Sequence, residues 1–305
     1  MKKAVVTGPT GAIGIALTNE LSDHGYKVFA VARPGSKRLE RIPPEAETII
    51  CSPDEYLSLP GKIGETADLF FHLAWAGAAG VGRNDVELQY ENIGFSLAAV
   101  KAAHLLGCKR FIGAGSQAEY GMADTKLSPS TPVHPETAYG VAKLCAGQLT
   151  AQLCGQLGIE HDWVRILSVY GPFDGENTMI LSVIHRLLRG ESPDLTPGEQ
   201  LWDYLFSEDA AIALRLVAEK GRNNAVYCLG SGTEKPIREY VLEIREALGS
   251  EIPLNFGAVP YSDGQIMRLC ADISDLRRDT GFAPKFDFSD GIKKTIEWYK
   301  TQSDQ

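Results

Sequence analysis

The sequence lacks the residue spacings that mark metal centres and disulfide frameworks. Its six cysteines are scattered along the chain, with no Cys-x-x-Cys pair and no histidines at a matching spacing. Zinc sites need such clusters, and small disulfide-rich folds need closely spaced cysteines. We therefore expect no metal ion, and free thiols that the cytoplasm keeps reduced.

The chain also lacks an excess of positive charge and any long apolar run. Thirty basic residues against thirty-nine acidic ones give a net charge of −9, which argues against binding to a nucleic acid backbone. The apolar stretch at residues 4–6 is too short for a signal peptide, and no later stretch approaches the length of a membrane span. We expect a cytoplasmic protein with neither nucleic acid nor membrane as a partner.

A length of 305 residues favours one large domain with a smaller lobe. The chain starts as an apolar, β-branched strand at Lys3–Thr7, followed by a glycine turn and a helix at residues 15–24 that Gly25 ends. A second strand is expected at Lys27–Ala32. This order is typical of a strand–helix–strand unit.

Later segments continue the pattern. Short apolar runs at 69–74 and 110–114 flank a helical segment at 86–106, and a long helix at 135–158 precedes a strand at 161–169. Runs of this kind are buried in parallel sheets that helices cover on both faces. The first half of the chain therefore predicts the α/β class, with a doubly wound parallel sheet of the Rossmann type.

Beyond Gly171-Pro172 the signals are mixed. The expected elements are helices at 178–189, 209–220, 237–248 and 290–299 and strands at 203–206 and 226–229. This order predicts a smaller mixed α/β lobe interleaved with the last strands of the sheet. We assign residues 1–171, with about 203–229, to the dinucleotide-binding domain, and residues 172–202 and 230–305 to a substrate-binding lobe.

A glycine turn joins the first strand to the first helix. Gly8, Gly11 and Gly14 recur at every third residue of this turn. Such glycines allow a tight turn and a close approach of the backbone to a pyrophosphate, which the N–H groups at the helix start then bind. The predicted cofactor contacts in this segment are Thr7, Gly8, Thr10, Gly11, Ala12, Ile13 and Gly14.

The end of the second strand bears on the choice of cofactor. An acidic side chain there would accept hydrogen bonds from a ribose 2′-hydroxyl, whereas an arginine favours a 2′-phosphate. Arg33 occupies this place, and Lys37 and Arg38 follow it. We expect NADP, bound by Arg33 and Arg38, with NAD as the alternative; these residues also fit a loop of solvated charges.

Tyr139 and Lys143 stand four residues apart, on one face of a helix if that segment is helical. A free phenol has a pKa of roughly 10. A fixed cation nearby lowers this pKa by stabilising the phenolate, so that the tyrosine becomes an acid–base catalyst. The same spacing also fits a solvated lysine beside a half-buried tyrosine, so its weight depends on the rest of the chain.

Several motifs, in their order and spacing, resemble the extended short-chain dehydrogenase/reductases, the group of nucleotide-sugar epimerases, dehydratases and 4-ketoreductases. These motifs are the glycine turn, His72-Leu73-Ala74, Asn92 in a helix, Ser116 after a strand, Tyr139-x-x-x-Lys143 and Tyr170-Gly171-Pro172. The C-terminal half resembles the abequose-synthase-like branch of sugar-nucleotide reductases. The segments that carry this second resemblance are 171–177, Gly198-Glu199-Gln200 and Phe256-Gly257-Ala258.

The resemblance implies a role for each motif residue. Tyr139 would exchange a proton with the C4 oxygen of a sugar while a hydride moves between C4 and the nicotinamide. Lys143 would lower the pKa of Tyr139 and bind the nicotinamide ribose, and Ser116 would hydrogen-bond the same sugar oxygen. The predicted catalytic residues are therefore Ser116, Tyr139 and Lys143. The resemblance also makes Tyr139 and Lys143 cofactor contacts, together with Leu73, Ala74 and Asn92. It makes His72 a structural or cofactor-contacting residue.

One pair of residues is missing after Ser116. Dehydratases of the family carry Asp-Glu directly after this position, and the present chain has Gln117 and Ala118 there. We therefore do not expect dehydration. Glu119, one residue further on, is expected to be a surface carboxylate.

The substrate side also departs from the family. Trp202 and Ser262 stand where two arginines of the family reach the pyrophosphate, and Ser168 stands where asparagine is common. Losing two guanidinium groups removes strong charge-assisted hydrogen bonds. Either other cations replace them, or the substrate is not an ordinary nucleoside diphosphate sugar. The candidate cations are Arg165, Arg186, Arg189 and Arg268, and the predicted substrate contacts are Ser116, Ser168, Asn177 and Trp202.

The leading hypothesis is an NAD(P)-dependent 4-ketoreductase, which transfers a hydride from the reduced cofactor to C4 of a nucleotide-activated sugar. One alternative is a nucleotide-sugar 4-epimerase with tightly bound NAD, and another is a reductase of a non-nucleotide carbonyl compound. A protein that binds a cofactor for regulation, without turnover, is the alternative from a different class. The family resemblance further favours a homodimer that pairs the helices at 86–106 and 135–158 with those of a second subunit.

Overall fold

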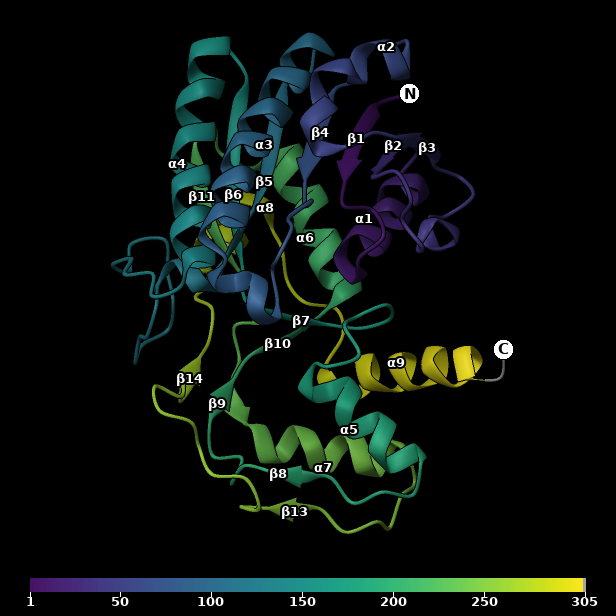
Figure 1. The fold of residues 1–305 in the computed structure, drawn as a ribbon, viewed down its shortest axis with the longest axis vertical. Helices are drawn as coiled ribbons and strands as arrows, with labels where there is room; N and C mark the ends of the chain where they lie inside the picture. Colours follow the sequence, from purple (N-terminus) through teal and green to yellow (C-terminus); the bar gives the residue numbers. More distant parts are fainter. Residues whose placement is uncertain (304–305) are drawn as a thin grey trace.

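Seven parallel strands form the central sheet (Figure 1). The computed structural model describes residues 1–303 of the chain. In space the strands follow the order β11, β6, β5, β4, β1, β2, β3. Their bounds are β1 (Lys3–Thr7), β2 (Lys27–Ala32), β3 (Glu47–Ile50), β4 (Leu69–His72), β5 (Arg110–Ser116), β6 (Glu160–Ile166) and β11 (Ala225–Leu229).

Helices cover both faces of this sheet, which is why its central strands β1, β2 and β4 are mainly apolar. On β1, Val6 packs toward the side of α1 and α6, whereas Val5 packs toward the side of α3 and α4. The bounds of these layers are α1 (Ala12–Asp23), α6 (Ser207–Lys220) and α8 (Ser274–Thr280) on one face, and α2 (Leu59–Ile63), α3 (Val86–Leu105) and α4 (Ala138–Leu157) on the other. The predicted α/β class with a doubly wound parallel sheet is confirmed.

The strand order reverses between β1 and β4. From β1 the chain proceeds outward to β2 and β3 on one side, and then returns to β4, β5 and β6 on the other. In open α/β sheets a crevice forms at the carboxyl ends of the strands where the order reverses. Thr7 and His72, the last residues of β1 and β4, therefore mark the expected ligand position.

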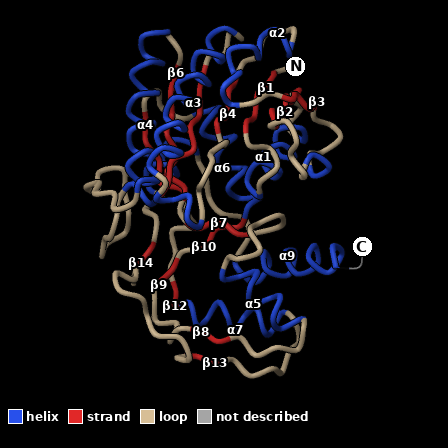
Figure 2. The backbone as a smooth tube through the Cα atoms, in the orientation of Figure 1, coloured by secondary structure: helices blue, strands red, loops and turns tan. Residues whose placement is uncertain are grey.

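A smaller part of the chain lies beyond the carboxyl ends of the sheet (Figure 1). It contains α5 (Met179–Leu188), α7 (Ile237–Ala247) and α9 (Phe288–Ser303), whose apolar faces share one core. Figure 2 shows its strands as short pieces between long loops. Their bounds are β7 (Ser168–Tyr170), β8 (Asp194–Leu195), β9 (Leu201–Trp202), β10 (Tyr204–Phe206), β12 (Lys235–Pro236), β13 (Asn255–Phe256) and β14 (Arg268–Leu269).

The single strand expected at 161–169 is wrong. The structure divides it into β6, which stays in the large sheet, and β7, which pairs with β10 in a separate two-stranded sheet. Between them the Leu167 amide donates to the Leu229 carbonyl, so the chain leaves the sheet at that residue. The proposed division into two domains stays a prediction, with β11 in the large sheet and β10 outside it.

Among the described residues, no helix combines the length and the apolar character needed to cross a membrane.

Candidate active site

The end of β5 and the first turns of α4 bring the three predicted catalytic residues together. Ser116 is the last residue of β5, and Tyr139 and Lys143 lie on α4, which starts after its N-cap Thr137. The Thr137 side chain accepts a hydrogen bond from the Gly140 amide and so fixes the start of the helix. All three catalytic candidates are buried, and Ser116 is near enough to Tyr139 to lower the pKa of its phenol. Their roles in catalysis stay predictions.

The backbone of the glycine turn is closely packed at Gly8 and Gly14 and open at Gly11. A Cβ atom at Gly8 would lie 2.8 Å from the Ala74 nitrogen, and one at Gly14 would lie 2.1 Å from the Gly8 oxygen. At Gly11 a Cβ atom would meet no described atom within 4 Å. Gly11 is also the N-cap of α1, where the first helical N–H groups have no partner within the helix. This opening fits the pyrophosphate of a dinucleotide, with Thr10, Ala12 and Ile13 around it.

Thr7 and His72 tie together the ends of β1 and β4. The Thr7 hydroxyl lies 2.9 Å from Nδ1 of His72 and accepts from the Ala74 amide at 3.3 Å, and Nε2 of His72 lies 3.2 Å from the Ser96 hydroxyl. Burial, with a smaller contribution from Lys143, lowers the pKa of His72 to about 3. His72 is therefore neutral at neutral pH and holds Leu73 and Ala74 above the glycine turn.

Asn92 anchors the loop that follows β4. Its side-chain oxygen accepts from the Ala76 amide at 3.0 Å, and its nitrogen donates to the carbonyl oxygens of Ala76 and Leu88. The side-chain amide of Asn92 is thus hydrogen-bonded to the backbone. A substitution of Asn92 would affect the cofactor through the position of this loop. Asn92 as a direct cofactor contact stays a prediction.

Arg33 and Arg38 lie exposed in the loop after β2. They form no ion pair with any residue of the described part of the chain, so both guanidinium groups are available to an anion. Their assignment to an NADP phosphate stays a prediction.

The electrostatics of Tyr139 differ from the sequence-based expectation that Lys143 lowers its pKa. Burial raises the pKa of Tyr139, hydrogen bonding by Ser116 and the charge of Arg83 lower it, and the charge of Glu119 raises it. Lys143 donates to the Ala114 carbonyl at 2.7 Å, and burial lowers its pKa to about 7 against the opposing charge of Glu119. In this arrangement Tyr139 is a weaker acid than free tyrosine.

The expectation that Glu119 is a surface carboxylate is wrong, because its side chain is fully buried. One carboxylate oxygen accepts from the Ser116 amide at 2.8 Å and from the Trp163 indole at 2.9 Å, and the other accepts from Arg165 at 2.7 Å. Ser116 and Glu119 form a capping box around a short 3₁₀ turn. The sequence pattern Ser-x-x-Glu could have revealed this arrangement.

Four arginines were candidates to replace the two pyrophosphate-binding arginines of the family, and their surroundings differ. Arg165 is buried against Glu119, and Arg268 forms an ion pair with Glu234, so neither is a free cation. Arg186 lines a cavity of about 460 Å³ in the smaller part of the chain. Arg189 follows α5 at the surface. Arg186 is therefore the candidate that faces a ligand-sized space.

The same cavity gathers two of the four predicted substrate contacts. Asn177 and Trp202 line it together with Gln200, Tyr204 and Phe256. The Trp202 indole donates to the Ser168 hydroxyl at 2.8 Å, so Ser168 is placed directly behind the cavity wall. Ser116 instead lies at the catalytic end, beside Tyr139.

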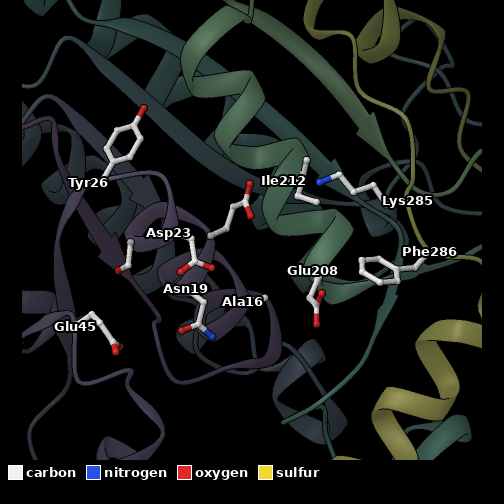
Figure 3. A pocket seen from close by; sticks show the side chains of 11 residues that line it. Ala16, Asn19, Asp23, Tyr26, Glu45, Glu208, Ile212, Lys285 and Phe286 are labelled. Atoms are coloured by element: carbon white, nitrogen blue, oxygen red, sulfur yellow. The ribbon is translucent and has the colours of Figure 1, made fainter.

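A larger cavity, of about 590 Å³, lies between α1, α6 and the segment around Lys285. Figure 3 shows the carboxylates of Asp23, Glu45 and Glu208 around it. None of the predicted catalytic, cofactor or substrate residues lines this space. Across residues 1–303, no group of three or more His, Cys, Asp and Glu side chains is placed to hold a metal ion.

Known proteins share both the fold and the sequence pattern. The model of the NAD dependent epimerase/dehydratase family matches residues 4–230. A solved UDP-N-acetylglucosamine 4-epimerase from Methanobrevibacter ruminantium M1, in complex with UDP-N-acetylmuramic acid, aligns over 99% of both chains with a TM-score of 0.88 and 28% identity. MoeE5, solved with UDP-glucuronic acid and NAD, aligns over 98% of this chain and 99% of its own, with a TM-score of 0.83 and 25% identity.

Among curated proteins, the dTDP-glucose 4,6-dehydratase of Xanthomonas campestris pv. campestris is 29% identical over 203 residues. This match covers 63% of the present chain and 58% of that relative, so it spans little more than half of the relative's length.

A doubly wound parallel sheet, with Ser116 at the end of β5 and Tyr139 and Lys143 on the following helix α4, has the architecture of an enzyme of the short-chain dehydrogenase/reductase type. The chain belongs to the NAD dependent epimerase/dehydratase family. The predicted family and enzyme class are thereby confirmed. The relatives named above are 4-epimerases and dehydratases or bind UDP sugars, and they do not represent the abequose-synthase-like branch.

Proposed function

We propose that this protein is a 4-epimerase of a nucleotide-activated sugar that keeps its NAD bound between turnovers. The observation that carries the proposal is the buried group of Ser116, Tyr139 and Lys143. The loop after β4 links this group to the glycine turn, because Ala74 lies against Gly8 and Trp75 packs on Tyr139. Positions 117 and 118 carry no acid or base for the removal of water. The likeness to a solved UDP-N-acetylglucosamine 4-epimerase over 99% of both chains supports inversion at C4 over net reduction.

A nicotinamide dinucleotide, when bound, accepts and returns the hydride of the sugar. Ser116 donates a hydrogen bond to the sugar C4 oxygen, Tyr139 takes up the proton of the C4 hydroxyl, and Tyr139 later returns this proton. Lys143 would bind the ribose hydroxyls of the dinucleotide. Because the hydride can return to either face of the C4 ketone, one set of residues inverts the carbinol centre.

The cavity around Trp202 is the proposed site of the nucleotide part of the substrate. Arg186 would neutralise a phosphate in place of the missing arginines, Asn177 would hydrogen-bond it, and Trp202 would stack on the base or the sugar. The cavity volume of about 460 Å³ is within the range of small-molecule sites.

A homodimer through α3 and α4 is part of the proposal. Val86 and Tyr90 on α3 and Val141 on α4 are each more than half exposed. Burying these side chains against a second copy would remove apolar surface from water. A sedimentation experiment that finds only monomer at micromolar concentration would refute this part.

A second candidate function, an NADP-dependent 4-ketoreductase, is supported by Arg33 and Arg38, which are exposed and have no ion-pair partner within residues 1–303. An arginine after β2 suits a 2′-phosphate. If this function holds, Arg33→Ala lowers NADP affinity at least tenfold and leaves NAD affinity unchanged.

One experiment separates these functions. Purified protein is denatured to release and quantify bound nucleotide, and the native protein is incubated with UDP-glucose, UDP-N-acetylglucosamine or dTDP-glucose while proton NMR follows C4. The proposal expects near-stoichiometric NAD and inversion at C4 without added cofactor. Stoichiometric reduction of added NADP⁺, with oxidation of the C4 carbinol to a ketone, would replace it by the ketoreductase running in reverse, and a 4-keto-6-deoxy product would refute both.

A further inference from the structure

The loop after β4 covers the catalytic tyrosine. The Trp75 ring meets the Tyr139 ring edge-on, with 6.0 Å between the centroids and an angle of 89° between the planes. Trp75 is held by Gln89, whose side-chain oxygen accepts from the indole at 2.8 Å. From the same loop, the guanidinium carbon of Arg83 lies 4.5 Å from the centroid of the Tyr139 ring. Tyr139 thus has an aromatic and a cationic neighbour from this loop.

Among the described residues, the cations Arg83 and Lys143 lie near Tyr139, and they differ in distance and in charge. The Lys143 nitrogen is 5.9 Å from the Tyr139 ring centroid and 3.8 Å from that of Trp75, so it lies closer to the indole. Burial also lowers the pKa of Lys143 to about 7, so that this side chain is only partly charged near neutral pH. An arginine keeps its charge throughout this range.

Arg83 has no carboxylate partner in the described part of the chain. Its guanidinium donates to the Ala78 carbonyl at 3.1 Å, and no ion pair within residues 1–303 includes it. Acidic side chains outnumber basic ones in this protein, which has a net charge of −9. Within the described residues the Arg83 guanidinium nevertheless stacks on a buried tyrosine and pairs with no carboxylate. A cation over an aromatic face is attracted by the ring, and it attracts a phenolate more strongly than a neutral phenol.

We propose that Arg83 is a second cation of the catalytic centre, a positioning residue that packs on Tyr139 and stabilises its phenolate. This inference rests on the proposed acid–base role of Tyr139. Arg83 adds a permanently charged group to the pair of Tyr139 and Lys143. In that pair the only cation is the lysine, whose charge varies with pH. Arg83 therefore widens the pH range over which Tyr139 can exchange a proton.

The groups that face Tyr139 come from four elements. Ser116 lies at the end of β5, Glu119 on the 3₁₀ turn after it, Lys143 on α4, and Arg83 with Trp75 on the loop after β4. Burial raises the pKa of Tyr139, Ser116 and Arg83 lower it, and Glu119 raises it. Removing the charge of Arg83 should therefore raise the pKa of Tyr139 further, because burial and Glu119 would then be opposed by Ser116 alone.

A direct titration of residue 139 tests the proposal without a substrate. 3,5-Difluorotyrosine, whose phenol ionises near neutral pH, is placed at position 139, and ¹⁹F NMR follows its ionisation in the full chain. We expect Arg83→Met to raise the pKa of this phenol by about one pH unit, and Arg83→Lys to raise it by less, because lysine keeps the charge. An unchanged pKa in Arg83→Met would overturn the proposal.

The matched control is Arg41→Met. Arg41 stacks on the Phe173 ring at 5.5 Å, so the control removes the same kind of contact away from Tyr139. It should leave the titration of residue 139 unchanged, and an equal shift in this variant would also refute the proposal. If the shift appears with Arg83→Met while no nucleotide sugar is turned over, Arg83 keeps its electrostatic role and the proposed 4-epimerase function fails by itself.

Discussion

Glu119 and Arg165 form a buried ion pair at 2.7 Å, behind the residue that ends β5. The carboxylate also accepts from the Ser116 amide and the Trp163 indole, and Arg165 donates in turn to the Tyr120 hydroxyl. Because each charge has several hydrogen bonds, the pair is held in one geometry. The turn that carries Ser116 is thereby fastened to β6.

Replacing Glu119 by Gln should destabilise the fold by about 3–5 kcal/mol, because Arg165 would remain as an uncompensated buried charge. Urea unfolding followed by circular dichroism measures this loss. The double variant Glu119→Gln with Arg165→Met should recover much of it, since no unpaired charge is left. Glu208→Gln, which breaks an exposed ion pair with Lys294, is the control and should cost less than about 1 kcal/mol. Equal losses in Glu119→Gln and Glu208→Gln would contradict the assignment.

Tyr139→Phe should lower kcat by about 10²–10⁴-fold, because the phenol is the proposed proton carrier. The substitution removes one oxygen atom, so NAD affinity and thermal stability should stay near those of the unchanged protein. Calorimetric binding and single-turnover kinetics measure the two effects. Tyr26→Phe is the matched control, because its hydroxyl bonds Glu219 away from the site. Turnover that survives Tyr139→Phe would refute the proposed mechanism.

The central fold could be predicted because its signals are local. β1 and β2 agree with the expected bounds residue for residue, since each is a short apolar run closed by a turn. β3 was missed, because only Ile49 of its four residues is buried and its apolar pattern is weak. The two-residue strands of the smaller part, such as β8 and β13, have no sequence signal of their own and form where distant loops meet.

The candidate site shows the same limit. Ser116, Tyr139 and Lys143 were found from motif spacing, and the structure places them together. The burial of Glu119 depends on its pairing with Arg165, 46 residues away, and the packing of Arg83 on Tyr139 depends on how a loop folds back. Contacts between residues so far apart in the chain cannot be derived from local spacing.

The glycine turn allows a paired test of structure and binding. At Gly14 an added Cβ would lie 2.1 Å from a backbone oxygen, so Gly14→Ala should destabilise the protein by about 1–3 kcal/mol or more through overpacking. At Gly11 the added methyl meets open space, so Gly11→Ala should leave stability within about 1 kcal/mol. If a pyrophosphate lies at this opening, Gly11→Ala should still weaken NAD binding at least tenfold by calorimetry. Unchanged affinity would place the cofactor elsewhere.

Asp162, on β6, links stability to pH. Burial raises the pKa of this carboxyl to about 7, against the opposing charge of Arg110, whose guanidinium lies 3.5 Å away. The unfolded chain releases this proton near pH 4 and the folded chain holds it until about pH 7, so the folded state binds more protons between these values. The contribution of Asp162 to stability is therefore fully present below pH 4 and is lost as the pH rises to 7.

Asp162→Asn should remove this dependence, because asparagine does not ionise. At pH 8 the variant should be more stable than the unchanged protein by roughly 2–4 kcal/mol, and at pH 4 the two should be nearly equal. Urea unfolding at pH 4, 6 and 8 measures the difference. The control is Asp23→Asn, at the exposed last residue of α1. It should shift the free energy of unfolding by less than about 0.5 kcal/mol at each pH. A variant that is less stable at pH 8 would mean that Asp162 is charged in the folded protein and that its pairing with Arg110 outweighs the cost of burial.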